Sequence, residues 1–200
     1  MHNSKNSSFK IPPIPLSRIG DISNSGFHLI DSSTALAYNP VANLVKLRYL
    51  TDLLSQGREI YVTPQIFKEI SYAGPKDFRT RAREQGLTNQ LTDARMSFGV
   101  ACYDTKHIFR PFAKGAVSEL VPTQDALCNT PLSYADRELV LSGLYAANTE
   151  FGLGRKTRVY SNDGRLVLET VRSRRNYDGF IAVDRVDEEI PPDIFEKYAP

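Results

Sequence analysis

Short apolar runs alternate with longer segments of helical spacing along most of this chain, and this alternation constrains the fold most strongly. The run "FHLIDSS" at 27–33 precedes "NPVANLVKLRYLTDLLSQG", where apolar residues recur every three or four positions until a glycine. The run "EIYVTP" at 59–64 leads into a second helix, with Thr63 as its cap and Pro64 at its first position. Strands that alternate with helices predict an α/β fold with a parallel sheet covered on both faces.

The same alternation continues toward the C-terminus. Further strands are predicted at 116–122, 157–162 and 180–186, and further helices at 133–150 and 164–174. The segment 73–115 interrupts this order, and we expect a variable insertion there, polar and helical over 79–101 and a loop from 104. We therefore expect a flexible N-terminal tail over 1–26, one domain over 27–190 and a C-terminal tail over 191–200.

Charge and composition narrow the class of protein. The chain has 200 residues, 25 Lys or Arg and 23 Asp or Glu, so its net charge of +2 does not by itself indicate a polyanionic partner. Cys102 and Cys128 have no Cys or His at zinc-finger spacing, and we expect both to be reduced. The N-terminus lacks the apolar core of a signal peptide, and no run has the length of a membrane span. A cytoplasmic protein without membrane contact is predicted.

Two acidic residues follow predicted strands at the edge where open parallel sheets bind ligands. Asp31 follows the first strand and Asp163 follows the strand "TRVYSN". Each also has a purely structural explanation, because Asp31 can cap a turn and Asp163 can cap the next helix.

Two further acids lie on predicted helices. Asp136 shares a stripe with Val140, which should face inward, whereas Glu138 points to the opposite side and is predicted to face solvent. Glu69 lies beside the buried side of its helix. The structural alternatives are a capping box between Ser133 and Asp136 and a surface ion pair for Glu69.

The segments "LIDSSTAL", "YVTPQIFKEI", "LSYADRELVLSGLYAA" and "RVYSND" together resemble the PIN-domain nuclease family. The resemblance spans 27–186 apart from the insertion, and it places Asp31, Glu69, Asp136 and Asp163 at that family's acidic positions in the same order. It implies a three-layer α/β/α sandwich with a mostly parallel five-stranded sheet, and an endonuclease that uses Mg²⁺ or Mn²⁺ and acts mainly on RNA. Many members have another acid directly after the last position, where this chain has Gly164 and Arg165.

The resemblance also implies a role for each side chain. Asp31 and Asp163 would bind metal directly, Asp136 would complete the site, and Glu69 would bind metal or orient the attacking water. Carboxylate oxygens without His or Cys suit Mg²⁺. Ser33 and Ser161 would position water or phosphate, and Asn162 would hold the turn.

An acidic site repels a phosphate backbone unless cations lie nearby, so basic segments are candidates for RNA binding. These candidates are Arg155, Lys156 and Arg158 before the fourth strand, and Lys106, Arg110 and Lys114, which are interleaved with His107, Phe109 and Phe112. The aromatic residues fit a protein core equally well. The expected partner is single-stranded or structured RNA, and the resemblance also admits a homodimer or a protein regulator.

Other functions fit the sequence less well. A haloacid-dehalogenase-like phosphatase requires a second Asp two residues after the first, where Ser33 stands. No glycine-rich phosphate loop follows a predicted strand, because "GLGRK" precedes one. The main alternative is a PIN-like module that binds RNA or protein without cleaving it, with its acids serving as helix caps.

Overall fold

The structure is a computed structural model that describes residues 16–23, 26–110, 129–148, 157–173, 181–186 and 189–200. The strand expected at 116–122 lies outside these residues, as do Phe112, Lys114, Cys128, Arg155 and Lys156.

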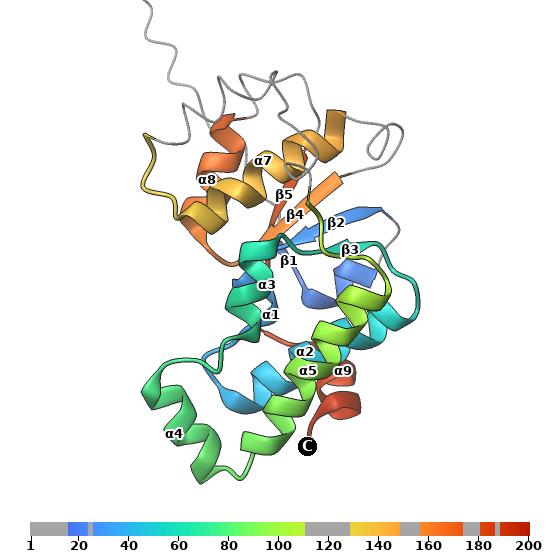
Figure 1. The fold of residues 1–200 in the computed structure, drawn as a ribbon, viewed down its shortest axis with the longest axis vertical. Helices are drawn as coiled ribbons and strands as arrows, with labels where there is room; N and C mark the ends of the chain where they lie inside the picture. Colours follow the sequence, from blue (N-terminus) through green and yellow to red (C-terminus); the bar gives the residue numbers. More distant parts are fainter. Residues whose placement is uncertain (1–15, 24–25, 111–128, 149–156, 174–180, 187–188) are drawn as a thin grey trace, which may run out of the picture.

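A parallel sheet forms the centre of the molecule (Figure 1). Its order is β1-β5-β4-β2-β3, and every pairing is parallel. The longer strands β2 (Phe27–Ile30), β4 (Thr157–Ser161) and β5 (Ile181–Val186) occupy the middle. The strands at the edges, β1 (Leu16–Ser17) and β3 (Ile60–Tyr61), have two residues each. The predicted α/β class with a parallel sheet is confirmed.

Helices cover both faces of this sheet. Neighbouring residues of β2 and β4 point to opposite faces, so Leu29 and Val159 enter one core while Ile30 and Tyr160 enter the other. The first core packs against α7 (Tyr134–Asn148) and α8 (Gly164–Ser173). The second packs against α2 (Pro40–Ser55), α3 (Pro64–Ser71) and α5 (Thr88–Asp104). The remaining helices are η1 (Ile19–Ser23), α1 (Ser32–Ala35), α4 (Lys76–Glu84) and α9 (Pro192–Tyr198).

Local capping sets where the helices begin. The Asn39 side chain accepts a hydrogen bond from the backbone N of Val41 at 2.9 Å, and Pro40 follows it at the first helical position. Thr63 accepts from the backbone N of Ile66 at 3.4 Å in the same way, as the sequence predicts. These caps fix the directions in which α2 and α3 leave the loops that follow β2 and β3.

The expected tails are wrong in part, because both contain residues of the core. Within 1–26, β1 pairs with β5, and Ile19 and Ile22 of η1 are buried. Within 191–200, α9 buries Ile194, and Arg48 of α2 donates a hydrogen bond of 2.9 Å to the carbonyl of Tyr198. Burial of these apolar side chains holds both segments on the domain.

The segment 73–115 is also more than a variable insertion. The part expected to be helical, 79–101, lies in two helices, α4 and α5, which are separated at Gly86 with its positive φ of 68°. Phe78 and Phe98 are buried in the core that includes α2. After α5 the chain returns to the sheet, where Ile108 forms a parallel bridge with Val62. The described part of this segment, 73–110, is therefore a structural layer of the domain.

Candidate functional site

The candidate site lies where the strand order reverses. From β2 the chain proceeds to β3 on one side, and β4 and β5 lie on the other, so the carboxyl ends of β2 and β4 meet at the switch point. Asp31 follows β2, and Ser161 is the last residue of β4. The backbone N of Asp31 donates to the carbonyl of Tyr160 at 2.9 Å, which holds the two strand ends together.

The Asp31 carboxylate is buried, with 3% of the residue exposed, and donors surround it. Its Oδ1 accepts from the backbone N of Ser32 at 2.7 Å and so caps α1. Its Oδ2 accepts from the hydroxyls of Ser33 at 2.5 Å and Ser161 at 2.7 Å. Strand β4 and helix α1 thus hold one carboxylate in a fixed orientation, so Asp31 is a helix cap and also the centre of a polar network.

Glu69 joins this network from α3. The hydroxyl of Ser32 donates to Oε2 of Glu69 at 2.6 Å, so the residue next to Asp31 connects the two acids. Ser32 was absent from the predicted site. Its adjacency to Asp31 at the start of α1 was the available signal, but its partner depends on how α1 packs against α3.

Asp136 lies within electrostatic reach of both acids. Burial is the main reason that the pKa of the Asp31 carboxyl lies above its usual value, and the negative charge of Asp136 raises it further. Hydrogen bonds from Ser33 and Ser161 act in the opposite direction. Burial likewise raises the pKa of Glu69, with added contributions from Asp31 and Asp136. Three acids from separate elements are therefore brought together.

The hydrogen bonds near Asp136 also agree with the structural alternative, in which Ser133 and Asp136 form a capping box. Its Oδ2 accepts from the backbone N of Ser133 at 3.0 Å, and the Ser133 hydroxyl accepts from the backbone N of Asp136 at 3.1 Å. This reciprocal pair is a capping box at the start of α7. The same carboxylate thus begins a helix and contributes charge to the site.

Asp163 is attached to the network through its backbone. Its N–H donates to the Ser161 hydroxyl at 2.9 Å. Its Oδ1 accepts from the backbone N of Arg165 at 2.7 Å and of Leu166 at 3.4 Å, so the carboxylate caps α8. The structure places Asp163 beside the site with its side chain engaged by the following helix.

The supporting residues form one chain of contacts. The Ser33 hydroxyl accepts from the backbone N of Asn162 at 2.9 Å and lies 3.3 Å from the Ser161 hydroxyl. Glu138, predicted to face solvent, instead accepts from the backbone N of Gln65 at 3.3 Å. That prediction is wrong because α7 packs against the N-terminus of α3, which brings Glu138 to a free N–H group.

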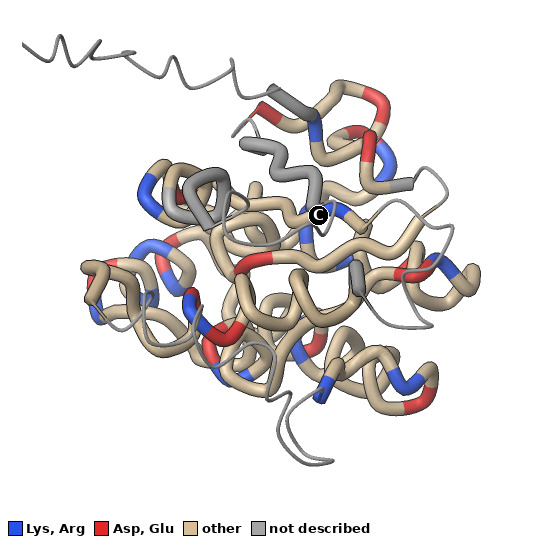
Figure 2. Tube along the Cα trace, turned by 90° about the horizontal axis from the view of Figure 1, so that it is seen from above, with Lys and Arg blue, Asp and Glu red and all other residues tan. Residues whose placement is uncertain are grey.

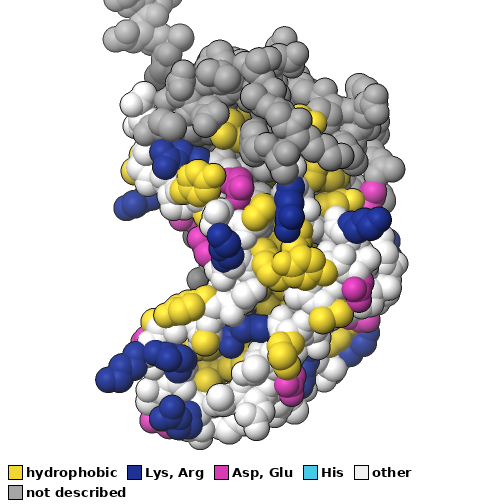
Figure 3. Space-filling view, viewed as in Figure 1, with side chains coloured by type: hydrophobic (Ala, Val, Ile, Leu, Met, Phe, Trp, Pro, Cys, Tyr) yellow, Lys and Arg dark blue, Asp and Glu magenta, His cyan; other side chains and the backbone are white. Residues whose placement is uncertain are grey.

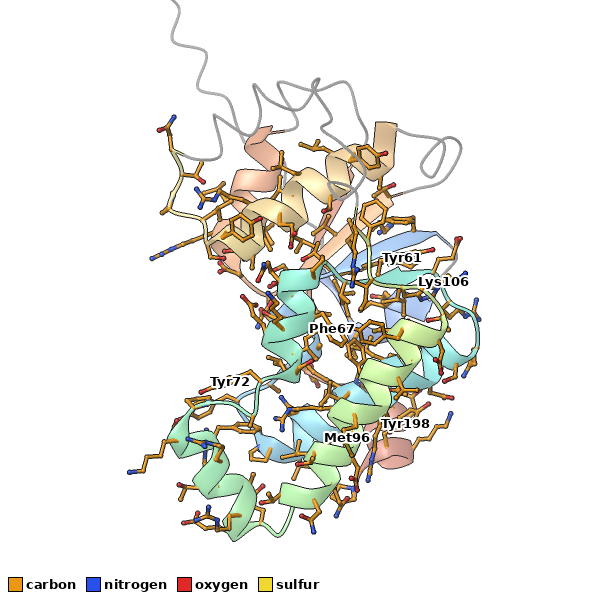
Figure 4. All side chains as sticks on the ribbon, in the orientation of Figure 1. Tyr61, Phe67, Tyr72, Met96, Lys106 and Tyr198 are labelled. Carbon is orange, nitrogen blue, oxygen red and sulfur yellow. The ribbon has the colours of Figure 1, made fainter. Side chains whose placement is uncertain are left out.

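The predicted basic segments have three described residues, Arg158, Lys106 and Arg110, and these do not surround this site. Arg158 lies near the start of β4, three residues before Ser161, or about 10 Å along a strand. Lys106 is exposed beside Tyr61 on the β3 side (Figure 4), and Arg110 is exposed further along. His107 and Phe109 are buried, with ring contacts to Tyr61, so they belong to the core.

Within the described residues, no three His, Cys, Asp or Glu side chains lie in an arrangement that could hold a metal ion. No helix in that part of the chain is both long and apolar enough to cross a membrane. Comparisons with protein-family models, with curated proteins and with solved structures return no match for this chain.

Proposed function

We propose that this protein is a divalent-metal-dependent endoribonuclease, with the α/β/α architecture of the PIN-domain nucleases that its sequence resembles. The observation that supports this proposal is the meeting of Asp31, Glu69 and Asp136 where the strand order reverses. These acids come from the end of β2, from α3 and from α7. Burial is the main reason that the pKa of Asp31 and of Glu69 is raised, and the negative charges of neighbouring acids add to it. A cation bound beside these acids would offset that negative charge.

The donor chemistry fits Mg²⁺ or Mn²⁺, because carboxylate and hydroxyl oxygens are the ligands these ions prefer. Asp31 and Asp136 would hold the ion, with Asp163 as the fourth acid and Glu69 either binding it or orienting the attacking water. Their side chains would have to move to do so, because no three of the described acids lie in a metal-binding arrangement. Such an ion lowers the pKa of bound water and stabilises charge on a phosphoryl group. It would compete with the hydrogen bonds that Ser32 donates to Glu69 and that Ser33 donates to Asp31.

The chain's own residues would prepare the reaction in two ways. The Ser161 and Ser33 hydroxyls hold the Asp31 carboxylate in one orientation. Glu69, which is exposed and has a raised pKa, is the acid best placed to accept a proton from an attacking water. Burial is the main cause of that raised pKa, and the charges of Asp31 and Asp136 add to it.

A PIN-like binding module without nuclease activity is the alternative, and one observation favours it. Asp31, Asp136 and Asp163 each cap a helix, so the fold gives a structural reason for all three. In that case RNA or a protein would bind without being cleaved.

Cleavage assays separate the two functions. The full chain would be incubated with a mixture of single-stranded and structured RNAs in Mg²⁺, in Mn²⁺ and in EDTA. We expect metal-dependent cleavage by the wild type that is lost in Asp31→Asn, Glu69→Gln and Asp136→Asn. The matched control is Asp104→Asn, because Asp104 is an exposed acid at the end of α5.

A melting experiment tests the metal separately from the substrate. Mg²⁺ should raise the Tm of the wild type, and the rise should be smaller in Glu69→Gln than in Asp104→Asn. Cleavage that persists in EDTA, or in all three site variants, would exclude this site. RNA binding without cleavage, together with a Tm insensitive to Mg²⁺ and Mn²⁺, would support the alternative.

A further inference from the structure

A hollow separates the acidic site from helix α4 on the face drawn in Figure 3. On the α3 side of this hollow, Lys and Arg side chains lie beside Asp and Glu side chains, whereas Lys and Arg side chains predominate over α4. Such a mixture of the two signs is common along the described chain (Figure 2). Tyr72, which ends α3, lies at the hollow (Figure 4). The α4 side is therefore the cationic side, and an exposed aromatic side chain lies between it and α3.

Helix α4 carries a stripe of cations. Lys76, Arg79 and Arg83 follow an i, i+3, i+7 spacing, which places them along one side of a helix, and all three are exposed. Phe78 and Ala82 bury a different side of α4. This stripe contains no acid, because Asp77 lies on the side of the helix where Arg81 pairs with it at 3.7 Å.

Two exposed tyrosines connect this helix to the acids. Tyr72 is 62% exposed, and its backbone N donates to the carbonyl of Glu69 at 3.1 Å, so it lies one helical turn from that acid. Tyr38 follows α1, the helix that Asp31 caps, and is 70% exposed.

Contacts with α4 fix the position of Tyr38. Its hydroxyl donates to Oδ2 of Asp77 at 2.9 Å, and the Arg81 guanidinium lies 3.5 Å from its ring centroid. An open pocket of about 580 Å³ is lined by Tyr38, Lys76, Asp77, Thr80 and Arg81. The cationic helix is thus attached to the element that carries Asp31, rather than hinged away from it.

We infer that Tyr72, Lys76, Arg79 and Arg83, the α4 wall, bind a single-stranded nucleic acid and guide it to the acidic site. The inference depends on the proposed function only in assigning cleavage to that site. A phosphate backbone is repelled by Asp31, Glu69 and Asp136, so binding must come from cations beside them. The exposed ring of Tyr72 stacks on a base, and stacking requires a base that is unpaired. The cations and this ring together select a single strand over a duplex.

The test measures binding apart from cleavage. Fluorescence anisotropy would follow a labelled single-stranded RNA of about 12 nucleotides, within the length range of single-strand sites, with the full chain in EDTA. Tyr72→Ala should weaken binding about 5- to 100-fold, the usual effect of losing one stacked base. The triple variant Lys76→Glu, Arg79→Glu, Arg83→Glu should weaken it further and reduce the slope of log K against log salt by about 2, for three phosphate contacts.

Matched controls come from other surfaces of the chain. Tyr103→Ala removes a tyrosine that is 60% exposed, at the end of α5 away from α4. Arg58→Glu reverses an exposed cation in the turn before β3, at the opposite edge of the sheet. Both controls should bind like the wild type. Thermal melts of every variant verify that each one is folded.

The inference is overturned if the wild type does not bind, if the α4 wall variants bind no more weakly than the controls, or if a duplex of equal length binds as tightly as the single strand. This failure differs from failure of the proposed function. If the protein cleaves RNA in Mg²⁺ but the α4 wall variants bind RNA normally, the nuclease function is supported and the role of the α4 wall is contradicted. If RNA binding depends on the α4 wall but no cleavage is seen, the role of the α4 wall is supported and the nuclease function is contradicted.

Discussion

The hydroxyl of Ser161 donates a 2.7 Å hydrogen bond to Oδ2 of Asp31 and thereby joins the ends of β4 and β2. The same hydroxyl accepts from the backbone N of Asp163 at 2.9 Å. One buried serine therefore connects a buried carboxylate to the turn that begins α8, and its removal should be costly.

Ser161→Ala should lower the free energy of unfolding by about 1 to 3 kcal/mol at neutral pH, because a buried hydrogen bond to a carboxylate is lost. Urea denaturation measures this change. The matched control is Ser55→Ala, since Ser55 is exposed and bonds only to the carbonyl of Thr51 in its own helix. A Ser161→Ala variant as stable as the Ser55→Ala variant would show that this contact contributes little.

Asp31→Asn should alter how stability depends on pH. The pKa of Asp31 is raised in the folded protein, mainly by burial, so the folded state holds this proton more tightly than the unfolded state. This tighter proton binding stabilises the folded protein below the usual carboxyl pKa of about 4. The stabilisation is lost as the pH rises through the pKa that Asp31 has in the folded protein. The variant should therefore gain stability relative to wild type as pH rises. Urea titrations at several pH values measure this, and a constant difference would contradict it.

Asp163→Asn should leave the metal-free protein about as stable as wild type, because the amide oxygen can still accept from Arg165 and Leu166 at the start of α8. Asp163→Ala removes that cap and should cost about 1 kcal/mol. Thermal melts in EDTA compare the two variants. If Asp163 is the fourth acid of the nuclease, Asp163→Asn should also abolish cleavage, since an amide is a poor ligand for a hard cation. Normal cleavage would restrict Asp163 to its capping role.

His107→Phe should remove a loss of stability at acidic pH. Burial lowers the pKa of His107, so the neutral ring is favoured in the folded state. Its contribution is present above the usual histidine pKa of about 6.5 and is lost as pH falls through the lowered folded value. Phenylalanine keeps a ring beside Tyr61 but cannot protonate. Thermal melts of the variant and the wild type above and below this pH range test the effect. Unchanged RNA binding by the variant would agree with a role of His107 in the core.

Ile194→Ala tests whether α9 belongs to the domain. Ile194 is buried in the core, whereas its neighbour Phe195 is 40% exposed. Removing the buried side chain should cost about 2 kcal/mol or more, and Phe195→Ala should cost less. Thermal melts of the two variants compare positions on one helix. Equal effects would mean that the helix is only loosely attached.

Features determined by neighbouring residues were predictable from the sequence. Asn39 with Pro40, Thr63 with Pro64, and Ser133 with Asp136 carry their capping partners within a few positions, so α2, α3 and α7 begin close to where they were expected. The burial of α5 was underestimated, because this segment was predicted to be polar. Four of its buried residues nevertheless have helical spacing: Leu91, Ala94, Phe98 and Ala101. Small alanines among polar residues give a weak pattern that only packing against α2 makes clear.

The candidate site was predictable in its acids but not in its contacts. Asp31 and Asp163 follow strands, which places them at one edge of any parallel sheet. The link from Ser32 to Glu69 joins positions 37 residues apart and depends on the packing of α1 against α3. The predicted basic residues do not lie at the acids, because Arg158 lies near the start of β4 and the acids follow the ends of the strands. Helix α4 is positioned by contacts of Asp77 and Arg81 with Tyr38, which the spacing of residues in the sequence does not reveal.

The two-residue length of β1 and β3 has a consequence for assembly. Long outer strands present rows of unpaired N–H and C=O groups on which another chain can extend the sheet, and this is a common route to aggregation. Both outer strands of the described sheet are too short to offer such a row, and Val62 beyond β3 is already bridged to Ile108. These two described edges therefore offer little backbone for a second copy to pair with, so association at them would depend on side-chain contacts.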